Sequence, residues 1–212
     1  MTAAADGDTI VLADVGNTRI KLAVLVAADR ASAGGHRGVA ALPGVSGRQD
    51  LLSREFRPSN LQHWLSRVAA GPTLMLIASV HESAAVRLEA ALAEVSATRH
   101  RPIRQRRVGR EHLPLAVEVV EPARVGIDRL AAAAAAAAAK DPTRPAVVID
   151  CGTATTVDIF SREGAFLGGA ILPGPELLSR ALAEGTSRLP AVAELDGGAV
   201  PTMPGRSTQA AI

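Results

Sequence analysis

Aromatic residues are nearly absent from this chain of 212 residues. It has no tyrosine, one tryptophan and three phenylalanines. Stacking of bases on aromatic side chains is therefore a poor basis for binding single-stranded nucleic acid here.

Long apolar runs are also lacking, because none reaches the roughly 18–20 residues that a membrane-spanning helix needs. The opening segment MTAAADGDT has neither the basic start nor the apolar core of a signal peptide. We therefore expect no membrane partner.

Cysteine is reduced to a single residue, Cys151. One cysteine forms no internal disulfide and supplies no cysteine-rich zinc site. This usage is typical of the reducing cytoplasm, which is where we expect the protein to be located. We expect Cys151 itself to be a small buried residue beside a turn.

Charge is nearly balanced, with a formal net charge of +2, but six arginines gather between Arg99 and Arg110. A basic cluster of this kind can bind nucleic acid. The arginines at 104, 106 and 107 are interleaved with Ile103 and Val108, which favours a solvated strand at the edge of a sheet. We do not expect nucleic acid as a partner.

The apolar pattern predicts an α/β protein. Residues 10–15 and 19–26 are apolar and β-branched runs separated by a short turn, which predicts a hairpin. A third strand is predicted near 39–42, and the stretch 44–58 is interpreted as turns. A helix is predicted to begin at Asn60, with Asn60 as its N-cap. Strand 73–80, helix 82–97 and strand 103–108 then form a crossover unit.

The strand–turn–strand pattern occurs twice. After an alanine-rich helix predicted over 125–140, AVVIDCGTATTVDIF (146–160) repeats the order of IVLADVGNTRIKLAV (10–24). Aligning Asp14 with Asp150 places Gly16 on Gly152, an offset of 136 residues. A third strand over 165–171 and a helix over 175–185 follow. Self-similarity of this kind predicts a duplicated fold.

Both repeated turns suit a phosphate group. Glycine at a hairpin tip lets a ligand approach the backbone, and the short polar residues that follow match phosphate oxygens. Asp14 and Asp150 end strands that we expect to be buried, where each carboxylate can hold Mg²⁺ through water or a monovalent ion. Two ordinary hairpins are the alternative. Their alignment with an internal repeat favours a clamp for the phosphates of ATP.

Five segments resemble those of type III pantothenate kinases, which have an actin-like ATPase fold related to ribonuclease H. The segments are DVGNTRIK (14–21), VGIDRL (125–130), VVIDCGTATTVDIF (147–160), GGAILPG (168–174) and EGTSRLP (184–190). The resemblance implies two lobes of mixed sheets flanked by helices, at residues 9–124 and 125–212. Family members continue for several tens of residues past PGRSTQAAI, so we expect the second lobe to be incomplete.

The resemblance also implies an activity and a role for each site residue. The activity is ATP-dependent phosphorylation of pantothenate to 4'-phosphopantothenate, the first step of coenzyme A synthesis, by a homodimer. Asp128 would accept the proton of the pantothenate hydroxyl, Asp150 would bind a monovalent cation (K⁺ or NH₄⁺), and Mg²⁺ would accompany ATP. ATP would contact Asp14, Val15, Gly16, Asn17, Thr18, Arg19, Ile20, Lys21 and Thr153, and pantothenate would contact Gly126, Ile127, Asp128, Arg129 and Thr186.

General chemistry agrees with these roles. Phosphoryl transfer has a loose transition state, so positioning and charge neutralisation contribute most of the catalysis. Asp128 needs only to orient the hydroxyl and take its proton late, and Arg129 can recognise the pantothenate carboxylate through a bidentate fork. Two alternatives stay open: a non-catalytic transcriptional activator that resembles these kinases, and an ATPase switch related to actin. The Gly126–Arg129 motif argues against the switch, which has no small acceptor substrate.

Overall fold

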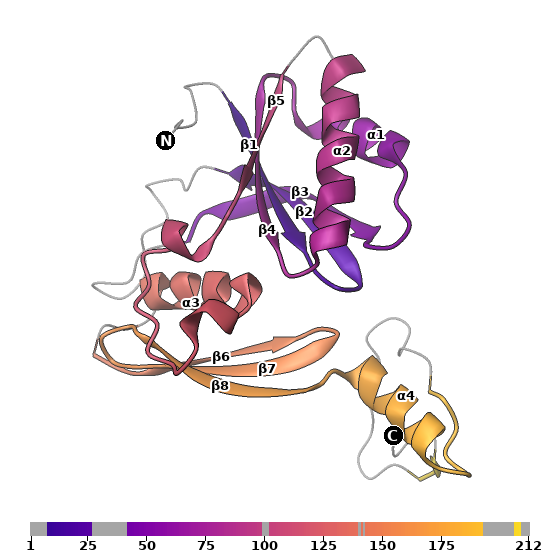
Figure 1. Ribbon diagram of the computed structural model, residues 1–212, viewed down its shortest axis with the longest axis vertical. Coiled ribbons are helices and arrows are strands. Elements are labelled where there is room, and N and C mark those ends of the chain that lie inside the picture. The colour runs from indigo at the N-terminus through magenta and orange to yellow at the C-terminus, as the bar shows by residue number, and fades with distance from the viewer. Residues whose placement is uncertain are drawn as a thin grey trace. The chain divides into compact units, whose positions relative to one another are not determined.

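The computed structural model describes residues 8–26, 42–98, 102–139, 141, 143–192 and 206–208. They form a five-stranded sheet, a three-stranded sheet and four α-helices (Figure 1). Two compact units result. The first contains the chain up to Ala146 together with Phe160–Leu167, and the second contains Val147–Ile159 and the residues from Gly168 on. The α/β class is confirmed, while a lobe boundary near residue 125 stays a prediction.

The first unit is built on a mixed sheet with the strand order β3–β2–β1–β4–β5. Strands β1 (Thr9–Val15) and β2 (Arg19–Val26) form the predicted antiparallel hairpin. Strand β4 (Thr73–Ser79) pairs parallel with β1, and β5 (Ile103–Arg107) pairs parallel with β4. The predicted crossover unit is therefore confirmed, and the arginine-rich β5 is an edge strand, as expected.

The third strand differs from its prediction. Residues 39–41 lie outside the described residues, and β3 covers Gly44–Leu52, a stretch interpreted as turns. It pairs antiparallel with β2 at the other edge of the sheet. Most of its residues are exposed and only Leu51 is buried. An edge strand is held by its backbone ladder and needs few apolar side chains, so the apolar pattern gave no signal.

Helix α1 covers Pro58–Val68, so it begins before Asn60. Its N-cap is Arg57, because Pro58 occupies the first turn, where a missing N–H costs nothing. Trp64 is buried on this helix, and its indole N–H donates to the Gly47 carbonyl at 2.7 Å. Trp64 thus joins α1 to β3 within the core of the first unit.

The core of the first unit lies between the sheet and the helices α1 and α2 (Glu82–Thr98), which lie side by side on one face (Figure 1). Alternate residues of β1 point into it, as the two-residue period of a strand requires. Each fully buried leucine or valine contributes about 1.5–3 kcal/mol to folding. The innermost members are Val11, Val15, Ile20, Leu61, Leu65, Met75, Ile77, Leu88 and Leu92.

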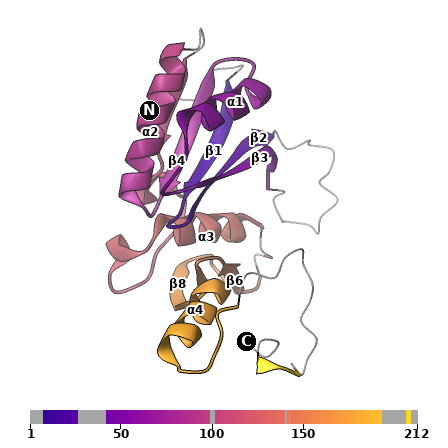
Figure 2. The same cartoon turned by 90° about the vertical axis from the view of Figure 1, so that its right-hand side faces the viewer.

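Helix α3 (Ile127–Ala139) contains the alanine run and lies across one end of the five-stranded sheet (Figure 2). It starts two residues later than predicted, after a single 3₁₀ turn at Pro122–Arg124. Leu130 and Ala133 are its buried residues. None of the helices in the described residues has the length and apolar composition of a membrane span.

The three-stranded sheet has the order β6 (Ala146–Cys151), β7 (Ala154–Phe160) and β8 (Phe166–Pro173), and α4 (Pro175–Gly185) follows it. Three successive strands are neighbours in this sheet and in the first one, where the order is β3–β2–β1. The duplicated strand–turn–strand pattern predicted from sequence is therefore present.

Burial in the second sheet differs from expectation. Strand β6 was expected to be buried, yet Val147 and Ile149 are 59% and 63% exposed. Cys151, at the end of the same strand, is exposed rather than buried. An apolar run indicates burial only where another element covers it, and the described residues do not cover this strand.

Candidate functional site

The first predicted phosphate turn is the tip of the β1–β2 hairpin. Asp14 and Lys21 are direct cross-strand neighbours, so their side chains lie on the same face of the sheet. The Lys21 Nζ atom is 4.0 Å from Asp14 Oδ2, and both side chains are about half exposed. The Lys21 ammonium therefore lies beside the Asp14 carboxylate at the loop.

Two predicted ATP contacts of this loop are restricted by burial. Val15 and Ile20 are paired across the hairpin and fully buried in the core. Their side chains cannot reach a ligand, so any contact with ATP would use their backbone atoms. Asn17, Thr18 and Arg19 are exposed at the tip.

A buried serine that the sequence did not point to lies against the loop. The Ser53 Oγ atom donates to the Gly16 carbonyl at 2.8 Å, and the Ser53 N–H donates to the Thr18 carbonyl at 2.9 Å. The Gly16 N–H in turn donates to the Arg19 carbonyl at 3.0 Å. No motif marks Ser53, because its position follows from the pairing of β3 with β2.

The Gly126–Arg129 segment lies at the same end of the sheet as the first loop. The Val80 N–H, directly after β4, donates to the Val15 carbonyl at the end of β1, with a length of 3.1 Å. A Cβ atom on Gly126 would lie 3.4 Å from Val80 Cγ1. Asp128 is in the first turn of α3, and its Oδ1 atom accepts a hydrogen bond from the Arg129 N–H at 2.8 Å. The carboxyl ends of β1 and β4 therefore carry both predicted motifs.

The guanidinium of Arg129 lies over an aromatic ring. Its guanidinium carbon is 5.4 Å from the centroid of the Phe166 ring, a cation–π distance. Phe166 is fully buried and its ring is tilted against Phe160, with 5.8 Å between centroids. The Phe166 N–H donates to the Ala116 carbonyl, and the Phe166 carbonyl accepts from the Glu118 N–H. Phe166 is thus a fixed platform that no sequence motif indicated.

The second predicted phosphate turn lies in the second unit. The Gly152 N–H donates to the Ala154 carbonyl, and the Gly174 N–H donates to the Thr153 carbonyl, each at 3.0 Å. A Cβ atom on Gly174 would lie only 2.0 Å from the Gly152 carbonyl oxygen. The last glycine of GGAILPG therefore closes tightly on DCGTATT. Asp150 and Thr153 are exposed beside this contact.

Thr186 ends helix α4. Its hydroxyl donates to the Leu182 carbonyl at 2.8 Å and accepts from the Leu189 N–H at 3.2 Å. Its described role is therefore to cap the helix, and a contact with pantothenate stays a prediction. The structure thus groups 14–21 with 126–129 in the first unit, and Asp150 with Thr153 in the second.

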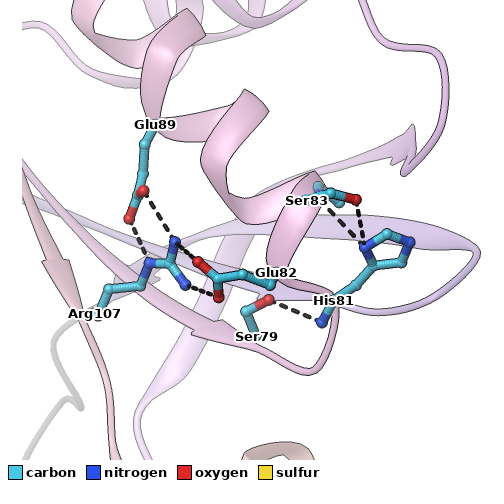
Figure 3. Close-up of polar contacts among 7 residues, drawn as sticks. Ser79, His81, Glu82, Ser83, Glu89 and Arg107 are labelled. Atoms are coloured by element: carbon cyan, nitrogen blue, oxygen red, sulfur yellow. Dashed lines mark hydrogen bonds and ion pairs between the residues drawn. The ribbon is translucent and has the colours of Figure 1, made fainter.

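Two arginines of the cluster, Arg104 and Arg107, form ion pairs, and Figure 3 shows those of Arg107. Arg107 on β5 donates to Glu82 at 2.9 and 3.1 Å and to Glu89 at 3.0 Å, which ties the edge strand to α2. The hydrogen bonds with Glu89 and Glu82 raise the pKa of Arg107, and the hydrogen bond and positive charge of Arg107 lower the pKa of Glu82. Arg104 forms a salt bridge with the buried carboxylate of Asp8.

Known proteins resemble this chain over most of its length. The family model for type III pantothenate kinase matches residues 10–212. A type III pantothenate kinase of Rhodopirellula baltica is 43% identical over 141 residues, which are 64% of this chain and 49% of that protein. One from Janthinobacterium sp. (strain Marseille) is 34% identical over 184 residues, 87% of this chain and 66% of that protein. The matches thus span about half to two-thirds of these relatives.

Likeness to solved structures is weaker. A Ppx/GppA phosphatase of Aquifex aeolicus, the type II variant, has a TM-score of 0.42 and 13% identity over 84% of this chain and 55% of that chain. A TM-score and a sequence identity this low support no inference about function. The family match, in contrast, includes both predicted phosphate turns and the Gly126–Arg129 segment. On that basis, this chain belongs to the type III pantothenate kinase family.

Proposed function

We propose that this chain transfers the γ-phosphoryl group of ATP to the primary hydroxyl of pantothenate, forming 4'-phosphopantothenate. The observation that carries the proposal is that the 14–21 loop and the 126–129 segment lie at the same end of one sheet. Phosphoryl transfer needs the phosphate donor and the acceptor hydroxyl to be held together in line. Membership of the type III pantothenate kinase family supports the choice of acceptor.

Asp128 would act on the acceptor hydroxyl. One of its oxygens accepts the Arg129 N–H, which holds the carboxylate at the start of α3. A carboxylate has two oxygens, so it can keep this bond while the other oxygen takes the proton as the O–P bond forms. The Lys21 Nζ atom, which is 4.0 Å from Asp14 Oδ2, would add positive charge near the phosphates.

Arg129 would recognise the carboxylate of pantothenate. The Arg129 guanidinium carbon lies over the Phe166 ring, 5.4 Å from its centroid, and the N–H groups of a guanidinium lie in the plane of that group. In-plane donors are those that a bidentate carboxylate uses. A cation–π contact acts through the charge of the guanidinium and does not require those donors, so it is compatible with substrate binding by Arg129.

We expect the cations that assist phosphoryl transfer to have few ligands from the protein. Among the residues that the structure describes, no three His, Cys, Asp or Glu side chains are grouped to hold a metal ion. A magnesium ion that travels with ATP needs only one or two carboxylates, because phosphates and water complete its shell. Asp14, whose side chain is about half exposed, fits that modest demand. A bound cation would neutralise phosphate charge, and Asp150 would hold the monovalent ion.

Turnover that depends on pantothenate tests the proposal. We expect ADP formation from ATP only when pantothenate is present. Asp128→Asn should lower turnover by about 100-fold or more, since general-base catalysis contributes about that factor. Its affinity for a non-hydrolysable ATP analogue should stay close to that of the parent. Asp141→Asn, the same change beyond the other end of α3, is the matched control and should leave turnover unchanged.

Two results would contradict the proposal. Near-normal turnover of Asp128→Asn would reject Asp128 as the base. Equal ATP turnover with and without pantothenate would reject the kinase and favour an ATPase switch.

A transcriptional activator is less well supported, because Arg104 and Arg107 form ion pairs with carboxylates of the protein itself. We also propose the homodimer and the cytoplasmic location, both supported by family membership alone.

A further inference from the structure

Ser53 is a fully buried polar residue with three hydrogen bonds, two that it donates to backbone carbonyls and one that its own carbonyl accepts from the Arg87 guanidinium. Its hydroxyl and its N–H both donate to carbonyls of the first loop, those of Gly16 and Thr18. We propose that Ser53 is a positioning residue that fixes the peptide between Gly16 and Asn17 in the orientation that binds ATP phosphates. This inference rests on the proposed role of the loop in binding ATP.

The geometry of the peptide group carries the first step. A trans peptide is planar, and its N–H points opposite to its C=O. The Gly16 carbonyl points to the Ser53 hydroxyl at 2.8 Å. The N–H of Asn17, which belongs to the same peptide, must therefore point away from Ser53. Asn17 is exposed at the hairpin tip, so its N–H is directed to the side where a ligand can approach.

Because residue 16 is glycine, this peptide needs the Ser53 hydrogen bond, which we call the tether, to hold its orientation. Rotation of a peptide plane changes ψ of the residue before it and φ of the residue after it. Gly16 has no Cβ atom to oppose the rotation, because glycine tolerates most backbone conformations. A rotated peptide would turn the Gly16 carbonyl oxygen towards the anion in place of the Asn17 N–H. The Ser53 hydroxyl opposes this, since rotation would leave a buried donor without its acceptor.

Arg87 extends the tether to helix α2. Its guanidinium donates to the Ser53 carbonyl, a charge-assisted hydrogen bond between two elements that are distant in sequence. Ser53 thus accepts a hydrogen bond from Arg87 of α2 and donates two hydrogen bonds to the loop. The loop is therefore braced by the core helix as well as by its own hairpin.

The experiment compares Ser53→Ala with Thr73→Val. Both changes remove a buried hydroxyl from the first unit. Ser53 directly follows β3, whereas Thr73 is on β4 and is paired with Thr9, at the opposite end of β1 from the loop. The probe is a non-hydrolysable ATP analogue with magnesium, titrated by calorimetry. We expect Ser53→Ala to raise its dissociation constant about tenfold and Thr73→Val to leave it unchanged. In turnover assays, KM for ATP should rise similarly while KM for pantothenate stays within about twofold of the parent.

Arg87→Gln is a second variant for the case in which Ser53→Ala does not fold. Arg87 is exposed, so its replacement preserves the core, and we expect the analogue to bind about threefold more weakly. Unchanged binding by Ser53→Ala, or by Arg87→Gln where Ser53→Ala is unfolded, overturns the assignment. An equal loss in Thr73→Val overturns it too, because the effect would then be general destabilisation.

Failure of the proposed function gives a different result. If the parent binds the analogue but forms ADP without regard to pantothenate, the kinase proposal fails. The affinities of the Ser53 and Thr73 variants then still decide the role of Ser53. If the parent does not bind the analogue at all, the loop is not a phosphate site and the assignment of Ser53 is wrong.

Discussion

Replacing Gly174 with alanine tests how tightly the second turn is closed. A Cβ atom at this position would lie 2.0 Å from the Gly152 oxygen and 2.6 Å from the Thr153 oxygen. Both atoms belong to the backbone, so no side chain can rotate away to make room. Gly174 has φ −70° and ψ 169°, a conformation that alanine adopts readily. Steric contact is therefore the sole expected effect, and the turn or the start of α4 must move.

The expected magnitude follows from the cost of overpacking. An added methyl group in a closed site costs about 1–3 kcal/mol. For a chain of this length each kcal/mol lowers Tm by about 2–4 °C, so we expect Gly174→Ala to unfold about 2–12 °C below the parent. Movement of Thr153 should also weaken binding of the ATP analogue. Thermal unfolding followed by circular dichroism and titration of the analogue measure the two effects.

Gly185→Ala is the matched control. The same methyl group at Gly185 would meet no atom within 4 Å, and Gly185 is the last residue of α4. Alanine is favoured over glycine in a helix by about 0.5–1 kcal/mol, so Tm should stay level or rise slightly. A Gly174→Ala variant with the Tm and nucleotide affinity of the parent would refute the tight closure described above.

Two further predictions concern charge and stacking. The pKa of Glu82 lies below its ordinary value of 4.5 in the folded protein, so its pairing with Arg107 stabilises the fold above pH 4.5 and is lost as pH falls through the lowered pKa. Glu82→Gln should therefore lower the urea midpoint at pH 7 and converge on the parent once the pH is below the lowered pKa of Glu82; a gap that is independent of pH would contradict this. Phe166→Leu should raise KM for pantothenate about two- to tenfold through loss of the cation–π contact with Arg129. Phe160→Leu, also fully buried, should cost similar stability without that rise, and equal KM values for the two variants would contradict the stacking role.

Regular elements of this chain were predictable because their signals are local. The β1–β2 hairpin follows from two apolar runs around a glycine turn, and the crossover from β4 through α2 to β5 follows from apolar period and length. Helix α4 was predicted with its observed bounds, since Pro175 and Gly185 mark its ends. The two Asp-x-Gly turns and the internal repeat were visible for the same reason.

The edge strand β3 was not predictable, because it is held by its ladder with β2 and has few apolar side chains. The exposure of β6 was also hidden, since an apolar run does not reveal whether anything covers it. These errors have one cause. Burial and edge pairing depend on contacts between segments, and local patterns report on them only indirectly.

The sequence by itself determined the class of fold, the two glycine-containing turns that we predict to bind phosphate and, through several distinct motifs, the resemblance to type III pantothenate kinases. Only the tertiary structure decided what supports those motifs: Ser53 behind the first loop, Phe166 under Arg129, and Gly174 against the second turn. Each support is a contact between residues far apart in the chain. A motif can be recognised in the sequence because it needs particular side chains at a fixed spacing. A residue that holds a motif in place needs only to contact it, and that contact is produced when distant elements pair and pack.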